Sequence, residues 1–276
     1  MDDMLSKRIP AVLVLCAAGM ALSPFRALQY VFGTIFVELL LDFGLVKHVF
    51  TPKARYFVLH VCFNSWLSYV VWGDSVAALR FPETGMTCAS DSGSGSPGFC
   101  DSAVVTTAGI TGFHVYHTLF FTGISAEDWV HHIVSCVVVP LIGINAPFGR
   151  VVSLSNLGMC GIPGALDYAM LAALKTPSLA AGNPARWALL EKRVNSMLNL
   201  LVRWPLMLLS SYIFAVGWAN GTLERTSALG AQLWVRIAMA VGCLLHTANA
   251  AYYAQKVIGN YYVKHEQAKS PAAKRA

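Results

Sequence analysis

Residues 127–175 read EDWVHHIVSCVVVPLIGINAPFGRVVSLSNLGMCGIPGALDYAMLAALK. The stretch holds two long apolar runs, over 128–146 and 151–173, and each is close to the roughly 20 residues that a helix needs to cross a bilayer. An open strand in lipid would leave backbone groups without hydrogen bonds, whereas a helix satisfies them internally. The stretch therefore predicts two transmembrane helices joined by a short turn.

The rest of the chain repeats this pattern. Hydrophobic residues make up 56% of the 276 and charged residues only 12%, with a mean hydropathy of +0.55, whereas about a quarter of an ordinary soluble domain is charged. We expect an all-α, polytopic transmembrane helix bundle of seven or eight spans, depending on whether the first run inserts. The candidate spans cover residues 8–24, 27–46, 55–73, 102–122, 128–146, 151–173, 197–218 and 229–255.

The apolar runs also divide the chain. We expect a short N-terminal span or signal anchor over 1–25, a transmembrane bundle over 26–256 and a basic cytoplasmic tail over 257–276. No clear small-residue cleavage site follows the first run, which favours an anchor over a cleaved signal peptide. The net charge of +6 lies between the runs and at the ends of the chain instead of forming one patch, so no nucleic-acid partner is expected.

Basic residues between the runs predict the orientation, because Lys and Arg accumulate on the cytoplasmic side. With alternating spans, the basic segments at 47–55, at 175–193 and at the C-terminus all fall on one side. The opposite side receives Cys88 and Cys100, which could close a disulfide, and Asn220, which begins a glycosylation sequon. Both features suit a lumen, so we expect an integral membrane protein of the endoplasmic reticulum or another secretory-pathway membrane.

Ionisable side chains inside spans are expensive and are therefore candidates for function. Asp128 lies three and four residues before His131 and His132, so its carboxylate can reach either imidazole on one helix face. His114 and His117 share a face of the preceding span, and we expect all four histidines near the cytoplasmic end. An imidazole beside a carboxylate can act as a general base. The alternative, that these histidines only mark the membrane interface, stays open.

Two other charged groups lie within spans. Glu38 and Asp42 are four residues apart and would repel if both were ionised. We expect at least one of them to be protonated, to reach toward the membrane surface or to pair with Lys47 or Arg26. Arg203 is interpreted as an anchor near the end of its span.

The order of polar residues from the histidine pair onward resembles the TLC-domain family of multi-span membrane proteins, and in part the ceramide synthases within it. EDWVHH opens an apolar helix, Asn145 and Arg150 fall in the turn that follows, and Asp167-Tyr168 with Lys175 end the next helix. The sequence departs from the ceramide-synthase pattern at CGIPGAL, just before Asp167, where a further His-Asp is missing.

The resemblance implies a protein that binds or processes acyl lipids. If it is an enzyme, it is an acyltransferase acting on a lipid, with His131 and His132 as base and acyl-carrying nucleophile or its partner. Asp128 lies beside this pair, and Asp167 would orient it across the helix interface. Acyl-CoA is the possible co-substrate, and no other cofactor and no metal is expected. A non-catalytic lipid-binding member of the family is an equal alternative because of the missing acid.

Two further classes remain open. The histidines of HVYH and of the adjacent pair could together hold one metal ion, and two of them could hold a haem. A structural or transport membrane protein is the other alternative, since Gly158, Gly161 and Gly164 would allow close helix packing without any ligand. The expected partner in each case is membrane lipid; an oligomer is possible, but the sequence does not support one.

Overall fold

The computed structural model describes residues 2–88, 100–121, 126–176 and 183–269. Within these ranges every regular element is helical and there is no β-strand, which confirms the predicted all-α class for this part of the chain. The α-helices are α1 (Asp2–Leu22), α2 (Arg26–Leu41), α3 (Lys47–Val49), α4 (Pro52–Arg80), α5 (Asp101–Phe120), α6 (Ala126–Ile133), α7 (Val139–Asn145), α8 (Arg150–Asn156), α9 (Ile162–Leu174), α10 (Pro184–Leu198), α11 (Trp204–Ala219), α12 (Thr222–Thr226) and α13 (Leu233–Lys269). A 3-10 turn, η2 (Pro82–Thr84), follows α4.

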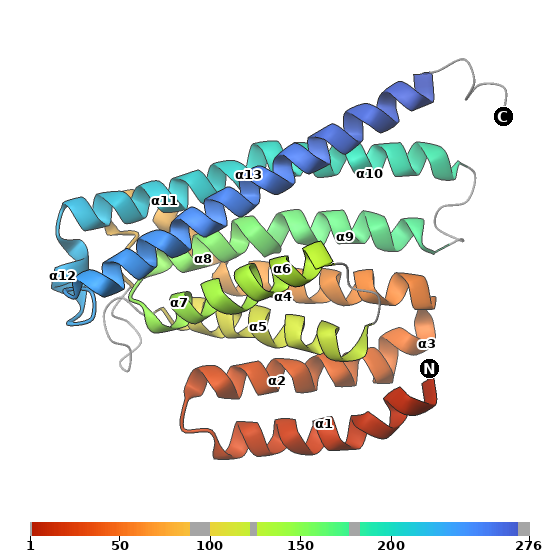
Figure 1. Ribbon diagram of the computed structural model, residues 1–276, viewed down its shortest axis with the longest axis horizontal. Coiled ribbons are helices and arrows are strands. Elements are labelled where there is room, and N and C mark those ends of the chain that lie inside the picture. The colour runs from red at the N-terminus through yellow and green to blue at the C-terminus, as the bar shows by residue number, and fades with distance from the viewer. Residues whose placement is uncertain (1, 89–99, 122–125, 177–182, 270–276) are drawn as a thin grey trace.

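Several of these helices join end to end through π-helical segments, which have a wider turn than the α-helix. The segments are η1 (Asp42–Val46) between α2 and α3, η3 (Val134–Val138) between α6 and α7, η4 (Leu157–Gly161) between α8 and α9, and η5 (Asn199–Arg203) between α10 and α11. The described chain thus forms a series of long rods: α1, α2–α3, α4, α5, α6–α7, α8–α9, α10–α11 and α13. Successive rods run in opposite directions, and the chain begins and ends at the same end of the bundle (Figure 1).

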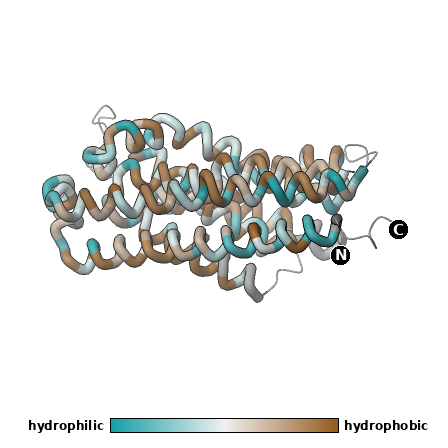
Figure 2. Tube along the Cα trace, turned by 90° about the horizontal axis from the view of Figure 1, so that it is seen from above, coloured by the Kyte–Doolittle hydropathy of each residue, from teal (hydrophilic) through white to brown (hydrophobic). Residues whose placement is uncertain are grey.

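Within the part of the chain that the structure describes, four rods are long and apolar enough to cross a membrane, judged by length and composition. They are Arg26–Val49, Arg150–Leu174, Pro184–Ala219 and Leu233–Gln267, and Ile9–Leu22 forms a shorter apolar helix. Large apolar side chains such as Val37, Leu201 and Leu244 are more than half exposed on the outside, and hydrophobic positions run along the helices in Figure 2. Such a surface is stable in lipid, because the hydrocarbon tails are as apolar as the side chains. These features are consistent with an integral membrane protein.

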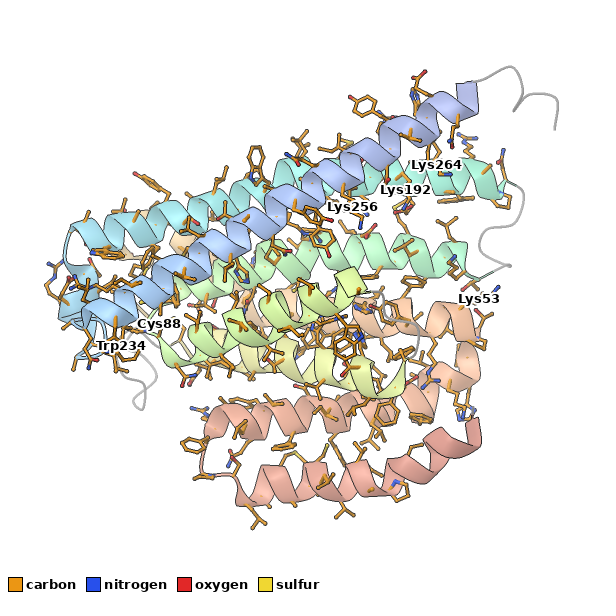
Figure 3. The ribbon with its side chains drawn as sticks, viewed as in Figure 1. Lys53, Cys88, Lys192, Trp234, Lys256 and Lys264 are labelled. Atoms are coloured by element: carbon orange, nitrogen blue, oxygen red, sulfur yellow. A yellow bond between two sulfur atoms is a disulfide. The ribbon has the colours of Figure 1, made fainter. Side chains whose placement is uncertain are left out.

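The two ends of the bundle differ in charge. Lys53 and Lys264 lie at the end where α3 meets α4 and where α13 finishes, which we call the basic end (Figure 3). Lys192 and Lys256 lie toward the same end, whereas Cys88 lies at the opposite one, which we call the disulfide end.

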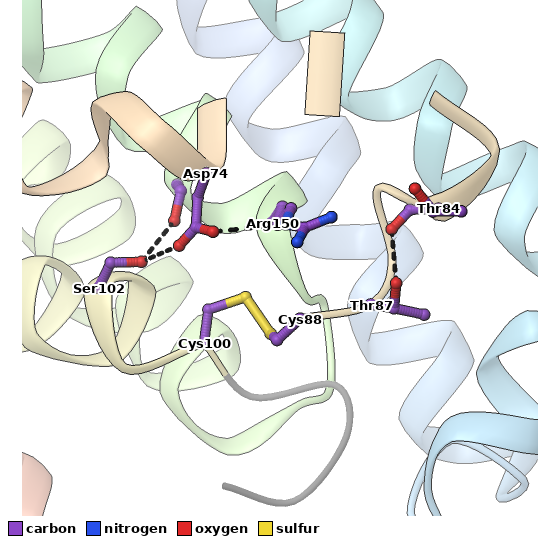
Figure 4. The surroundings of a disulfide bond; sticks show 8 residues. Asp74, Thr84, Thr87, Cys88, Cys100, Ser102 and Arg150 are labelled. Carbon is purple, nitrogen blue, oxygen red and sulfur yellow. Dashed lines mark hydrogen bonds and ion pairs between the residues drawn. A yellow bond between two sulfur atoms is a disulfide. The ribbon is translucent and has the colours of Figure 1, made fainter. Parts of the chain in front are cut away.

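The disulfide end is held together by covalent and polar contacts. Cys88 and Cys100 are joined by a disulfide with an S–S distance of 2.05 Å, which ties η2 to the start of α5. Next to it, Asp74 of α4 pairs with Arg150, whose Nε lies 3.4 Å from Oδ1, and accepts a hydrogen bond from Ser102 of α5 (Figure 4). Arg150, expected in the turn before the sixth apolar run, therefore begins α8 and connects it to α4.

The acidic pair on the second rod has a different partner from those expected. Asp42 forms a bidentate ion pair with Arg55 of α4 and accepts a hydrogen bond from the hydroxyl of Tyr116 on α5. The expectation of Lys47 or Arg26 as partner is wrong for Asp42, because α4 folds back against the end of the second rod and brings Arg55 to it. Arg26 instead pairs with Asp101 at 3.0 Å at the disulfide end.

Proline explains three of the π-helical segments. A proline lacks the backbone N–H and its ring clashes with the carbonyl four residues earlier, so the helix before it widens or kinks. Pro140, Pro163 and Pro205 each lie two residues after the end of η3, η4 and η5 respectively.

Arg203 satisfies one of the carbonyls that these prolines leave open. In a regular helix the carbonyl of Met159 would accept from the N–H of residue 163, which is a proline. Arg203 Nε donates to this carbonyl at 3.2 Å, and its Nη1 donates to Asn199 Oδ1 at 2.7 Å. Arg203, interpreted from the sequence as an anchor near the end of its span, lies near the middle of the α10–α11 rod, because this rod already begins at Pro184.

Two rods extend beyond the apolar runs that predict them. α10 adds residues 184–196 to the seventh run, and α13 continues as a helix to Lys269, past the expected start of the tail at residue 257. Both extensions are at the basic end. Apolar content alone does not predict them, since they carry charged residues outside the hydrocarbon-like section.

Candidate functional site

A cavity of about 630 Å³ lies between α4, α5 and the rods α6–α7, α8–α9, α10–α11 and α13. Its volume is within the range of about 300–1,000 Å³ that is usual for small-molecule sites. Apolar side chains from several rods form much of its wall: Phe57, Ile110, Phe113, Val139, Ile142, Phe148, Val151, Val152 and Met207. The polar lining includes His60, Asn64, His114, His117, His132, Ser155, Asn156, Asp167, Arg203, His246 and Asn249.

Four histidines gather in the cavity wall, and we call them the imidazole cluster: His60, His114, His117 and His132. The rings of His60 and His117 are stacked with centroids 4.3 Å apart, and His114 lies 5.7 Å from His117 and 5.1 Å from His132. Tyr168 packs on His60 at 4.0 Å. Ring contacts therefore connect the imidazole cluster across α6, α5 and α4, and Tyr168 continues these contacts to α9.

Backbone contacts fix the hydrogen position on two of the rings. The Nδ1 atoms of His60 and His114 lie 2.8 and 2.7 Å from the carbonyls of Tyr56 and Ile110, in the preceding helical turn of each. A carbonyl only accepts, so Nδ1 carries the hydrogen and Nε2 of the neutral ring keeps a lone pair. Each of these two imidazoles can thus act as an acceptor or base through Nε2.

His117 is the least satisfied member of the cluster. Its side chain is 1% exposed, and neither ring nitrogen has a hydrogen-bond partner within the described part of the chain. Buried polar atoms are nearly always hydrogen-bonded in folded proteins, so an unused donor and acceptor lining a cavity need an explanation. A polar group of a bound molecule would provide one.

The predicted pair on α6 is described only in part. The backbone of Asp128, His131 and His132 is helical and starts at the basic end, as the apolar pattern predicts. The side chains of Asp128 and His131 lie outside the described residues. His132 is buried and points to the cavity, and the structure brings it together with His114 and His117 as the helical spacing predicts.

His60 is among the polar residues that the sequence places inside a span, but its position does not predict that it joins the cluster, because no other histidine lies in that span. A signal does exist at helical spacing: Tyr56, His60 and Asn64 follow each other at intervals of four residues and so share one face of α4. All three line the cavity. A polar face on an otherwise apolar span is the pattern that could have identified them.

Asp167 lines the cavity but has an unexpected partner. Its carboxyl group is within hydrogen-bonding reach of Glu191 on α10, with Arg203 and Lys192 as the nearby cations. A hydrogen bond between two carboxyl groups needs a proton on one of them. Glu191 is 2% exposed and pairs with Lys192 at 3.0 Å. The sequence does not single out Glu191, because the basic segment at 175–193 is predicted to be a loop.

The remaining residues of the resemblance lie away from the cluster. Asn145 is exposed at the end of α7 and donates to the carbonyl of Leu141 at 2.7 Å. Lys175 is exposed at the end of α9, and its carbonyl accepts from Thr51 at 3.1 Å. Asn220, the candidate glycosylation site and not a residue of the resemblance, is exposed after α11, at the end of the bundle that carries the disulfide. Asn145 and Lys175 therefore make hydrogen bonds at helix ends and do not line the cavity.

No group of three or more His, Cys, Asp or Glu side chains within the described ranges is arranged to hold a metal ion. No family model, curated protein or solved structure matches the chain. The likeness to the TLC-domain family therefore rests on the sequence pattern and stays a prediction. The geometry provides a largely apolar cavity lined by a group of imidazoles, one of which, His117, has no hydrogen-bond partner for either ring nitrogen in the described part of the chain.

Proposed function

We propose that the protein is a multi-span membrane protein of TLC type, with seven or eight spans, that binds acyl lipids in this cavity and acts on them through the imidazole cluster. The observation that carries the proposal is the combination in one cavity of apolar walls and buried imidazoles, including His117 with both ring nitrogens unused. An acyl lipid has the same two parts, an apolar chain and a polar group that donates or accepts hydrogen bonds. The cavity and the ligand are therefore chemically complementary.

The span number rests on the alternating rods. Eight rods of alternating direction put the basic segments at one end and the disulfide with Asn220 at the other. Rods α4 and α5 are not among the four described helices that meet the length and composition criteria, and polar side chains of both line the cavity. Polar residues in spans are expected to face the bundle interior in this way. The arrangement supports a secretory-pathway membrane such as the endoplasmic reticulum, with the disulfide end in the lumen.

Acyl transfer is the reaction that the site supports best. A neutral imidazole takes the proton from a hydroxyl or amine of the acceptor lipid, and the freed oxygen or nitrogen attacks the thioester carbonyl of acyl-CoA. The carbon–sulfur bond breaks, and the leaving thiolate takes up the proton. Lys53 lines the cavity at the basic end, where the phosphates of acyl-CoA would arrive from the cytoplasm. His132 lines the cavity from α6, a helix that begins at the basic end, and is the base we assign to this step.

A comparison of cellular lipids tests the proposal. Cells expressing the wild type are compared with cells expressing the double variant His131→Ala plus His132→Ala, at matched protein levels. His48→Ala is the control, because His48 is exposed on α3 and does not line the cavity. We expect one acyl-lipid class to change with the wild type and the control and to stay at background with the double variant. Equal lipid profiles for all three, with the double variant eluting as a single folded species, would reject acyl transfer.

A further inference from the structure

A second polar group lines the same cavity on its far side from the imidazole cluster. Ser155 of α8 and His246 of α13 meet with Oγ and Nδ1 at 2.8 Å. Both line the cavity, and Ser155 is buried at 8% exposure. Ser155 lies thirteen positions before Tyr168, which packs on His60, so Ser155 and Tyr168 are about 20 Å apart along the α8–α9 rod.

The contact has the chemistry of a nucleophile and its base. Among the described residues, the Ser155 hydroxyl also lies 3.5 Å from Met207 Sδ, which is a weak acceptor. In the neutral ring with its hydrogen on Nε2, Nδ1 of His246 is the stronger acceptor of the hydroxyl hydrogen. A serine hydroxyl that donates to an imidazole is the arrangement by which serine nucleophiles are activated on unrelated folds.

Asn249 adds an unused donor beside this pair. It lies three residues after His246, on the same face of α13, and lines the cavity. Its Nδ2 is buried and has no hydrogen-bond partner among the side chains and backbone that the structure describes. Leaving a buried amide donor unpaired is unfavourable, so the position favours an acceptor oxygen from a bound molecule.

Apolar side chains complete the site. Val151 and Val152 precede Ser155 by one turn of α8, and Met207, Ile142 and Phe148 line the same cavity. A carbonyl group on an acyl chain that lies among these side chains would meet a hydroxyl, an imidazole and an amide donor together.

We propose that Ser155, His246 and Asn249 form an acyl-ester-cleaving centre, with Ser155 as nucleophile, His246 as base and Asn249 as oxyanion donor. The inference rests on the proposed acyl-lipid cavity. Ser155 Oγ attacks the ester carbonyl carbon while Nδ1 of His246 takes the hydroxyl proton, and Asn249 donates to the oxyanion. The bond from carbon to the alcohol oxygen breaks, and this oxygen takes the proton from His246.

The product of this first step is an acyl-serine. Water then attacks its carbonyl and gives a proton to His246, which returns it to Ser155 Oγ as the fatty acid leaves. The sum is one ester and one water converted to one alcohol and one carboxylic acid, with no oxidant or cofactor required.

Covalent labelling tests the centre directly. The full-length protein, purified in lipid nanodiscs, is treated with a long-chain alkyl fluorophosphonate, which reacts with activated serines, and the labelled peptide is identified by mass spectrometry. We expect labelling at Ser155 in the wild type and none in Ser155→Ala. His246→Asn should slow labelling by about 100-fold or more, and Asn249→Leu by about 100-fold. Ser153→Ala, on the same helix but outside the cavity lining, should label like the wild type.

Two results would overturn the proposal. One is wild-type labelling no faster than that of heat-denatured protein, and the other is unchanged labelling in Ser155→Ala. Lipids retained by the detergent-purified protein before it is placed in nanodiscs separate this outcome from failure of the proposed function. Acyl lipids that co-purify without labelling reject only the ester-cleaving centre, whereas the absence of co-purifying acyl lipids from every preparation rejects the lipid-binding cavity itself.

Discussion

At the scale of single residues, burial decides what an ion pair contributes. Asp42 is fully buried and its partner Arg55 is 16% exposed, whereas Arg26 and Asp101 are 58% and 50% exposed. Removing one member of a buried pair leaves an uncompensated charge and destabilises by about 3–5 kcal/mol, while an exposed pair contributes about 0–1 kcal/mol. Breaking the Asp42–Arg55 pair should therefore lower the free energy of unfolding much more than breaking the Arg26–Asp101 pair.

We predict that Arg55→Leu lowers the melting temperature of the purified protein strongly and that Arg26→Leu barely changes it. The reason is that Asp42 keeps only Tyr116 as a partner after the first change, whereas Asp101 remains accessible after the second. Thermal unfolding followed by intrinsic fluorescence measures both. Equal shifts for the two variants would contradict this account of the buried pair.

His117 leads to a prediction in which stability and function oppose each other. Both of its buried ring nitrogens lack a partner in the described structure, and each such atom is unfavourable by about 1–3 kcal/mol. We predict that His117→Leu raises the melting temperature while it reduces the amount of lipid that co-purifies with the protein. A lower melting temperature together with unchanged lipid content would show that the imidazole has a structural role instead.

At the scale of helical elements, proline and arginine act together in the α8–α9 and α10–α11 rods. Pro163 leaves the carbonyl of Met159 without its usual donor, and Arg203 supplies one from the neighbouring rod at 3.2 Å. Prolines within membrane helices are tolerated when neighbouring groups satisfy the freed backbone in this manner.

We predict that Arg203→Leu and Pro163→Ala are not additive. Arg203→Leu alone leaves the Met159 carbonyl unsatisfied and should destabilise, whereas in the Pro163→Ala background the new N–H can bond to it. The coupling should be about 0.5–3 kcal/mol, in the sense that the double variant is more stable than the sum predicts. Additive changes in a double-mutant cycle of thermal stability would remove the link between the two residues.

Glycine allows the closest helix contacts, as predicted for the α8–α9 rod. A Cβ at Gly158, Gly161 or Gly164 would lie 2.5–2.8 Å from a side-chain atom of a neighbouring rod. The sequence did not reveal the close contact between helix backbones at Gly112 of α5, where a Cβ would lie 2.5 Å from the carbonyl oxygen of Val31 on α2.

We predict that Gly112→Ala destabilises the bundle, because the backbone of α2 must move to admit the methyl group. Gly73→Ala is the matched control: it lies inside α4, and nothing is within 4 Å of its Cβ position. In α4 an alanine should be neutral or slightly stabilising, since glycine is a poor helix former. Yields of monodisperse protein and melting temperatures compare the two, and equal values would contradict the close α2–α5 contact.

At the scale of the whole molecule, much of the architecture could be predicted from the sequence. Long apolar runs predict the helices, and the distribution of Lys and Arg predicts which loops share an end, because both depend on average properties of segments. The partners across helices could not be predicted in this way. Glu191 beside Asp167, Arg55 beside Asp42 and His60 within the imidazole cluster all depend on how rods are rotated against each other, and hydropathy says little about rotation.

The central claim is that the cavity holds an acyl lipid, and glycines on α13 allow a direct test. Gly242 lines the cavity, and the nearest atom to a Cβ there is Ile142 Cγ2 at 3.6 Å, so a larger side chain can enter the space. Gly259 lies on the same helix, is exposed and has nothing within 4 Å of its Cβ position, so it provides the matched control.

The most direct measurement is mass spectrometry of lipids retained by the purified wild type, Gly242→Phe and Gly259→Phe. The account predicts that wild type and Gly259→Phe retain one acyl-lipid class enriched over the surrounding membrane, and that Gly242→Phe loses it because the phenyl ring occupies the cavity. Retention of the same enriched class by folded Gly242→Phe, or no enrichment in the wild type, would contradict the claim.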